Sequence, residues 1–200
     1  MKIVNNLGYL CLLVSLSLQA GDAKHTQIPH SLPVSITPET NSFYVGMGVG
    51  KFRLEDSDTD EVMTAATATL IVGYEMNRYL STELRYTRSL EDLSYEGATT
   101  KDLDMTFTNL ALYVKLGYEV YDFTSYVLLG YGESKISDFV GADRKEAGFQ
   151  YGVGIAYSID EKWSLFVDYT KAYDDKGFDG RSQQDDLNIG LWNFGVAYHF

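Results

Sequence analysis

Charged residues recur on one face of segments in which apolar and polar side chains alternate. Six are assigned to the face with the small and polar side chains: Glu83, Arg85, Lys115, Asp168, Glu75 and Glu133. If that face is buried, the charges must pair, because an isolated buried charge is very costly. Such a set can form a structural salt-bridge network or line a gated polar path or narrow pore. It could also supply a carboxylate pair for acid–base chemistry, and these three readings stay open.

Other groups could bind a metal, but their spacing does not support it. Residues 56–61 read D-S-D-T-D-E, which is similar to the start of a calcium loop. Glu61 stands where that loop needs glycine, and Thr67 where it needs glutamate. His25 and His30 are too few for a metal site on their own. We expect a solvated acidic loop, and neither a metal nor a cofactor.

The charges lie in a chain of strand-like segments. From residue 42 onward the alternation has period two, which predicts β-strands with two unlike faces. Each segment has about the 9–11 residues that a tilted strand needs to cross a bilayer. The eight predicted strands are 42–52, 64–76, 80–90, 105–118, 123–133, 147–158, 163–173 and 186–200.

The connections between these segments alternate in length. Short turns are predicted at 77–79, 119–122 and 159–162, and longer polar loops at 53–63, 91–104, 134–146 and 174–185. Tight turns on one side and longer loops on the other are typical of outer-membrane barrels, whose short turns face the periplasm. With eight strands, both termini are expected on that side.

The composition of the two faces favours a particular class of fold. One face carries mainly Gly, Ala, Thr and Ser, and the other mainly Leu, Val, Ile and aromatic residues. Small residues suit the narrow interior of an eight-stranded barrel, and aromatic residues at strand ends suit the membrane interfaces. The expected girdle comprises Tyr79, Tyr118, Tyr121, Tyr157, Trp163 and Tyr198. We therefore predict an all-β, eight-stranded antiparallel up-and-down transmembrane β-barrel, with a soluble sandwich as the alternative.

The N-terminal region indicates export. Residues 1–23 combine Lys2 with a short apolar run, which predicts a signal peptide cleaved after Ala20 or Ala23. Residues 24–41 read as a flexible periplasmic leader, and 42–200 as the barrel domain. The formal net charge of −12 argues against nucleic acid as a partner.

With these features in place, the chain resembles the OmpA-type outer membrane protein beta-barrel domain family. The resemblance rests on the signal peptide, the opening F-Y-V-G-M-G-V-G and the ending V-A-Y-H-F, and it covers 42–200. It implies a Gram-negative outer-membrane location with periplasmic termini and contact with lipid and lipopolysaccharide. It also implies insertion by the barrel-assembly machinery, with Phe200 and Tyr198 as the assembly signal. No peptidoglycan-binding domain is expected after the last strand.

This resemblance is weak for function. We expect a structural and surface-interaction role, in membrane integrity and in loop-mediated recognition or adhesion of an unknown surface partner. The alternative is a narrow porin-like channel for small solutes. A lipid A-modifying enzyme is disfavoured, because the only barrel histidine, His199, lies at the periplasmic end, away from Ser134 and Ser182. No enzymatic activity is predicted.

Overall fold

The computed structural model describes residues 42–56, 62–95, 105–139, 142–176 and 186–200. No helix in these segments is long and apolar enough to cross a membrane. The predicted signal peptide and leader, with His25 and His30, lie outside the described residues, as do Ser182 and 57–61 of the acidic loop. The strands are β1 (Ser42–Asp56), β2 (Val62–Asn77), β3 (Leu80–Ser89), β4 (Ser94–Tyr95), β5 (Thr106–Val120), β6 (Phe123–Phe139), β7 (Ala142–Ser158), β8 (Trp163–Lys176) and β9 (Asp186–His199).

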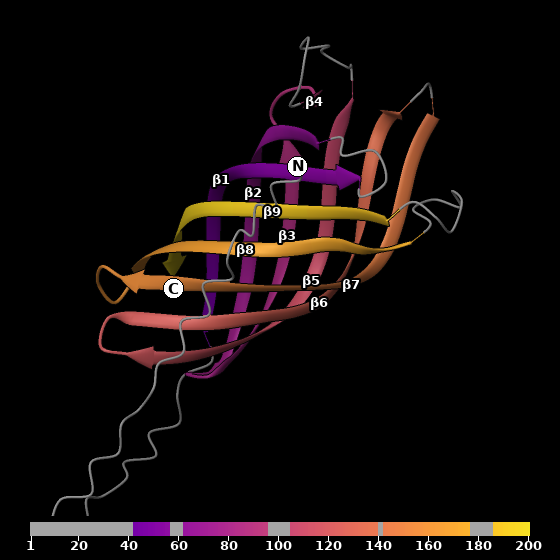
Figure 1. Cartoon of the computed structure of the whole chain (residues 1–200). Helices are drawn as coiled ribbons and strands as arrows, with labels where there is room; N and C mark the ends of the chain where they lie inside the picture. The colour runs from indigo at the N-terminus through magenta and orange to yellow at the C-terminus, as the bar shows by residue number, and fades with distance from the viewer. Residues whose placement is uncertain (1–41, 57–61, 96–104, 140–141, 177–185) are drawn as a thin grey trace, which may run out of the picture. The chain divides into compact units, whose positions relative to one another are not determined.

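Eight of these strands form a closed antiparallel barrel (Figure 1). Each barrel strand pairs with the barrel strands before and after it in the sequence, so that β3 pairs with β5. The short β4 is not one of the eight and adds only two residue pairs to β2. Closure comes from β1, which pairs with β2 on one side and with β9 on the other. Because a closed barrel satisfies its backbone hydrogen bonds without an open edge, it can lie in lipid. The predicted fold class is confirmed.

Side-chain hydrogen bonds fix two of the short turns. Asn77 Oδ1 accepts from the backbone N–H groups of Tyr79 and Leu80, at 2.9 and 3.0 Å. Asp160 Oδ1 accepts in the same way from Lys162 and Trp163, at 2.8 Å each. The third turn places Tyr121 at φ 56°, in the left-handed region. We call this side of the barrel the turn end and the opposite side the loop end.

The strands are longer at the loop end than predicted. Residues 134–146 were expected to be a loop, but most of them continue β6 and β7 as a paired hairpin. Similarly, β1 extends to Asp56 and β8 to Lys176. The loop prediction relied on polar composition. A hairpin beyond the bilayer has no apolar face to display, so its strands do not show the alternating pattern.

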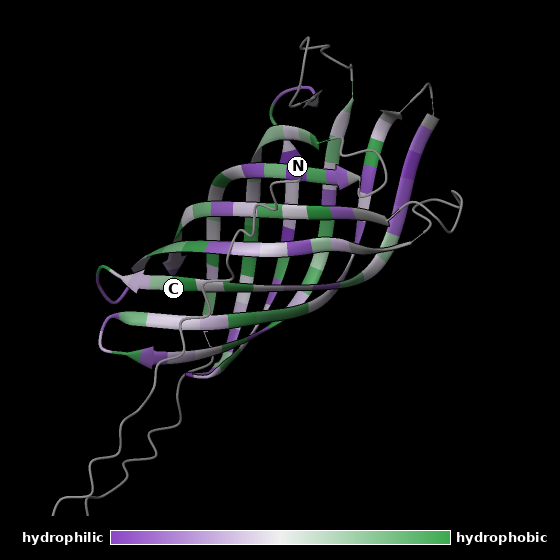
Figure 2. Ribbon diagram, in the orientation of Figure 1, coloured by the Kyte–Doolittle hydropathy of each residue, from purple (hydrophilic) through white to green (hydrophobic). Residues whose placement is uncertain are grey.

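The outer face carries the apolar side chains that a bilayer requires. Phe43, Met47 and Leu112 are representative, with exposed fractions of 58%, 62% and 58%. Figure 2 shows apolar and polar residues alternating along the strands. Of the predicted girdle residues, Tyr79, Tyr118, Tyr121, Tyr157 and Trp163 are exposed at the turn end, and Tyr198 is half-buried. A second set of outward aromatics lies nearer the loop end: Tyr86, Tyr131, Tyr151, Tyr169 and Trp192.

The interior at the loop end is apolar, which the sequence reading did not predict. Phe52 and Phe107 are fully buried, and their ring centroids lie 4.3 Å apart. An irregular stretch between β3 and β4 adds the buried Leu93, whose N–H bonds to Met105 O. We call this set the apolar cluster: Phe52, Leu54, Met63, Ala65, Leu93, Met105, Phe107, Ile136, Ala172, Tyr173, Ile189 and Leu191.

Candidate functional site

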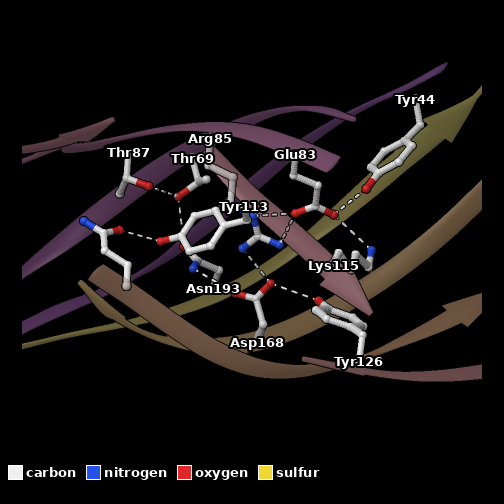
Figure 3. Close-up of polar contacts among 11 residues, drawn as sticks. Tyr44, Thr69, Glu83, Arg85, Thr87, Tyr113, Lys115, Tyr126, Asp168 and Asn193 are labelled. Carbon is white, nitrogen blue, oxygen red and sulfur yellow. Dashed lines mark hydrogen bonds and ion pairs between the residues drawn. The ribbon is translucent and has the colours of Figure 1, made fainter. Parts of the chain in front are cut away.

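The middle of the barrel interior holds a charged network (Figure 3). Glu83 and Arg85 come from β3, Lys115 from β5 and Asp168 from β8. All four point inward, because each occupies the inward phase of its strand. The structure thus brings together the four charged residues that were placed inside, and closure of the sheet lets β3 and β8 meet across the interior.

Arg85 is the central cation of this network. Its Nε and Nη2 both lie 2.6 Å from Glu83 Oε2, and its Nη1 lies 2.8 Å from Asp168 Oδ2. Lys115 Nζ lies 3.0 Å from Glu83 Oε1. Two cations therefore face two carboxylates in a setting where an unpaired charge would be very unfavourable. Mutual neutralisation and direct hydrogen bonding explain how four charges can be buried together.

Tyrosines complete the shell around the carboxylates. Tyr44 donates a short hydrogen bond to Glu83, and Tyr126 donates to Asp168 Oδ2 at 2.9 Å. Lys115 Nζ lies 4.3 Å from the centroid of the Tyr126 ring, a cation–π distance. The tyrosines thereby contribute both donors and ring faces. The sequence reading placed Tyr126 on the inward face but gave it no role.

A layer of neutral polar groups lies next to the charges. Asn193 Nδ2 donates to Asp168 Oδ1 at 3.0 Å, and Thr69 donates to Asn193 Oδ1 at 2.8 Å. Gln150 receives a hydrogen bond of 2.6 Å from Tyr113 and donates to Asn109 Oδ1 at 2.9 Å. Nearly every polar atom of this layer has a partner, as buried polar groups require. The layer leaves the charged residues little freedom to rearrange.

Glycines make room for the buried rings. A Cβ atom on Gly73 would overlap the Tyr44 ring, and one on Gly154 would meet the ring of Tyr126. Each glycine lies on the inward face of a strand beside its tyrosine, so the ring occupies the space that a side chain would fill. This pairing was missed in the sequence. The available signal was the run of inward glycines, which the sequence reading took as evidence of a narrow interior only.

On the loop side, the network gives way to the apolar cluster. Thr67 marks the boundary: its side chain is fully buried, and its Oγ1 has no hydrogen-bond partner among the residues that the structure describes. Beyond it lie Phe52 and Leu191, with exposed fractions of 0% and 1%. This region is lined mainly by apolar side chains, which offer little compensation to a hydrated ion.

On the turn side, the interior opens into a cavity of about 680 Å³, which we call the turn-end cavity. Lys115 and Glu83 lie at its inner part, and Glu75 and His199 also line it. The cavity therefore reaches the charged network from one side only.

Two further carboxylates were assigned to the inward face, and one assignment is wrong. Glu75 does face inward and lines the turn-end cavity. Glu133 is half-exposed on the outer face, where its carboxylate lies 3.6 Å from Lys145 Nζ. On β6 the inward residues have even numbers, from Tyr126 to Ser134, so an odd-numbered residue points outward. The charge of Glu133 is tolerated on the outer face because Glu133 lies toward the loop end, beside Lys145.

The terminal residues lie at the seam between β1 and β9. Phe200 is 73% exposed, its N–H bonds to Phe43 O at 3.0 Å, and its ring makes an edge contact with Tyr198. Both rings lie on the outer side of the closing strand, where another protein or lipid can reach them. An assembly-signal role for Phe200 and Tyr198 remains a prediction.

The chemistry of the interior is that of a fixed, neutralised core. In the described part of the chain, no group of three or more His, Cys, Asp or Glu side chains could hold a metal ion. Glu83 and Asp168 both contact Arg85, and each accepts a hydrogen bond from a tyrosine. The network fills the middle of the interior with paired charges.

A lipid-exposed, closed barrel with a filled interior defines an integral outer-membrane protein. The family model described as "Outer membrane protein beta-barrel domain" matches residues 10–200. The chain belongs to this family, and it is located in the Gram-negative outer membrane. No curated protein sequence matches it.

Solved structures of small outer-membrane barrels share the fold. Neisserial surface protein A is 17% identical, with a TM-score of 0.60, over 79% of this chain and 97% of that one. Ail, the attachment invasion locus protein of Yersinia pestis, is 17% identical, with a TM-score of 0.51, over 80% and 99%. OprG from Pseudomonas aeruginosa is 12% identical, with a TM-score of 0.52, over 80% and 96%. At these identities, the likeness concerns the fold alone.

Proposed function

We propose that this protein is a sealed outer-membrane barrel that supports membrane integrity and presents its loop end for recognition or adhesion. The observation that carries the proposal is the filled interior. The charged network blocks the middle, and the apolar cluster fills the loop end. A barrel that conducts nothing must act through its surfaces, and the surface outside the cell is the loop end.

The β6–β7 hairpin gives the loop end a defined binding feature. Among the described residues, β7 pairs with β8 only from Tyr151 to Ser158, whereas its pairing with β6 reaches Ala142. In Figure 1, β7 bends away from β8 at this end. We propose that this hairpin, which extends beyond the pairing of β7 with β8, contributes to recognition of a surface partner, the kind of role that the name of Ail states for that protein.

The outer face near the loop end also suits contact with lipopolysaccharide. Arg88, Lys135 and Lys145 lie in one register line across β3, β5, β6 and β7, separated only by Thr108. Arg88 stands two positions beyond the outward Tyr86, where lipid headgroups begin. Three cations on that line match the anionic phosphates of the outer leaflet. We propose that this basic line binds lipopolysaccharide, although Lys135 and Lys145 also pair with Asp143 and Glu133.

Replacing the basic line by Arg88→Gln, Lys135→Gln and Lys145→Gln should weaken lipopolysaccharide binding. In detergent, added lipopolysaccharide should raise the Tm of the unmodified protein, and the triple variant should lose at least half of that rise. The matched control is Arg78→Gln with Lys162→Gln, which removes cations at the turn end. An equal rise in the triple variant would contradict the proposed contact.

Planar-bilayer recordings test the sealed interior. We expect no unitary current steps from the unmodified protein, because the apolar cluster excludes hydrated ions. Phe52→Ala with Phe107→Ala removes two rings that contact each other in that cluster and should permit steps. Val49→Ala with Phe194→Ala removes a paired set from the outer face and should not. Regular steps from the unmodified protein would show that the barrel is open.

A narrow channel is the second candidate, and one observation favours it. The turn-end cavity already leads from the turn end to Lys115 and Glu83. If the network opened, the layer of neutral polar side chains and the apolar cluster would separate this cavity from the loop end. The same recordings decide between the two functions.

A further inference from the structure

Three side chains at the turn end are arranged in the order of a serine hydrolase triad. Ser164 Oγ lies 3.1 Å from His199 Nε2, and His199 Nδ1 lies 3.3 Å from Glu75 Oε1. These are a nucleophile, a base and a carboxylate that orients the base. If Nδ1–H donates to Glu75, Nε2 is free to accept the proton of the serine hydroxyl.

Neighbouring groups hold this arrangement in place. Ser42 donates to the other Glu75 oxygen at 2.7 Å, which orients the carboxylate. The His199 ring stacks on Tyr44, with ring centroids 5.1 Å apart. The imidazole is thus fixed by β8, β2 and β1 as well as by its own strand β9. Such support from surrounding side chains is what a preorganised reactive site requires.

The three side chains also face an accessible space. Ser164, His199 and Glu75 all line the turn-end cavity, which has room for a small molecule. The cavity is also lined by charged side chains of both signs, among them Lys115 and Glu119. Its lining therefore suits a short, polar acyl group better than a lipid chain.

We propose that the turn-end cavity is an acyl-transfer site for small polar esters, with Ser164 as the nucleophile. The Ser164 Oγ attacks the ester carbonyl, while His199 Nε2 takes the hydroxyl proton. The C–O bond to the leaving alcohol breaks, and the alcohol takes that proton from His199. Attack by water, with His199 again as base, would release the acid and restore the serine.

The backbone around Ser164 limits the rate of this reaction. Ser164 is paired in register with Ser158 on β7 and with Ala197 on β9, so its strand is engaged on both sides. Its backbone N–H is therefore not available to stabilise an oxyanion, and oxyanion donors supply a large part of hydrolase rates. We expect stoichiometric acylation of Ser164 followed by slow turnover.

The test uses p-nitrophenyl acetate and the full-length folded protein in detergent. We expect a burst of one p-nitrophenolate per chain, and one acetyl group on the Ser164 peptide by mass spectrometry. Ser164→Ala should abolish both, and His199→Gln should slow the burst at least tenfold. The matched control is Ser158→Ala, which removes a more exposed serine from the same cavity and should change nothing.

The difference in gel migration between unheated and boiled samples confirms that each variant is folded. The proposal is overturned if the folded protein gives no burst, if the acetyl group is on another residue, or if Ser164→Ala retains the burst. Lower stability of His199→Gln without acylation of the unmodified protein would also overturn it. The three side chains would then only fasten the terminal strand to β2 and β8. A sealed interior would stand in either case.

Discussion

Arg85→Met should destabilise the barrel more than any other single substitution in the network. It leaves Glu83 and Asp168 in the interior without the cation that both of them contact. Breaking a buried ion pair by removing one partner costs about 3–5 kcal/mol, because the remaining charge is uncompensated. Urea unfolding of the detergent-folded protein, followed by gel migration and intrinsic fluorescence, measures the change.

Two comparisons separate the charge effect from other losses. Arg88→Met removes an exposed arginine from the same strand and should change the free energy of unfolding by less than about 0.5 kcal/mol. Combining Arg85→Met with Glu83→Gln and Asp168→Asn removes the stranded charges and should recover much of the lost stability. If the single variant were as stable as the unmodified protein, the network would not hold the barrel together.

Gly73→Ala is expected to have the second largest effect. The added Cβ would collide with the Tyr44 ring, which cannot move aside without losing its hydrogen bond to Glu83. Overpacking of this kind costs typically about 1–3 kcal/mol. The same urea titration measures it, and failure of the variant to show the folded gel band would be the extreme form of the result.

Gly148→Ala is the matched control, because nothing lies within 4 Å of the Cβ it would add. It should leave stability unchanged or raise it slightly. A double variant, Gly73→Ala with Tyr44→Ala, tests the collision directly. The methyl group of the added alanine and the Tyr44 ring compete for the same space. The losses in free energy of unfolding of the two single variants should therefore sum to more than the loss of the double variant. Additive losses would mean that Gly73 matters for another reason.

The inward position of Glu83, Arg85, Lys115 and Asp168 could be predicted from period two alone. Successive residues of a strand point to opposite faces, so one well-placed apolar residue sets the phase of the whole strand. The same rule, applied to β6, would have placed Glu133 outside. Glu133 lies an odd number of residues after the inward Tyr126, and its side chain therefore points outward. The positions of the short turns could also be predicted, because short segments separate the alternating stretches on one side of the barrel.

Other features depended on residues far apart in the sequence. Whether Tyr44 meets Gly73, or Ser164 meets His199, is decided by the register between two neighbouring strands, and the alternation within either strand does not give that register. The full length of β6 and β7 could not be predicted, because their outer parts are polar. A hairpin outside the membrane has no apolar lipid-facing side, so its sequence lacks the alternation that indicates a strand. The apolar cluster was not predicted from the sequence either. Near the loop end, bulky residues such as Phe52 occupy the inward positions that glycine occupies nearer the turn end of β1.

The amino-acid sequence is enough to predict that this chain crosses the outer membrane as an eight-stranded barrel with Glu83, Arg85, Lys115 and Asp168 inside. That follows from local alternation, which each strand carries independently of the others. Which charges touch, where the interior becomes apolar and which side chains share the turn-end cavity are known only from the folded barrel. Those outcomes depend on the stagger of strands around a closed sheet, and no single segment of sequence contains that stagger.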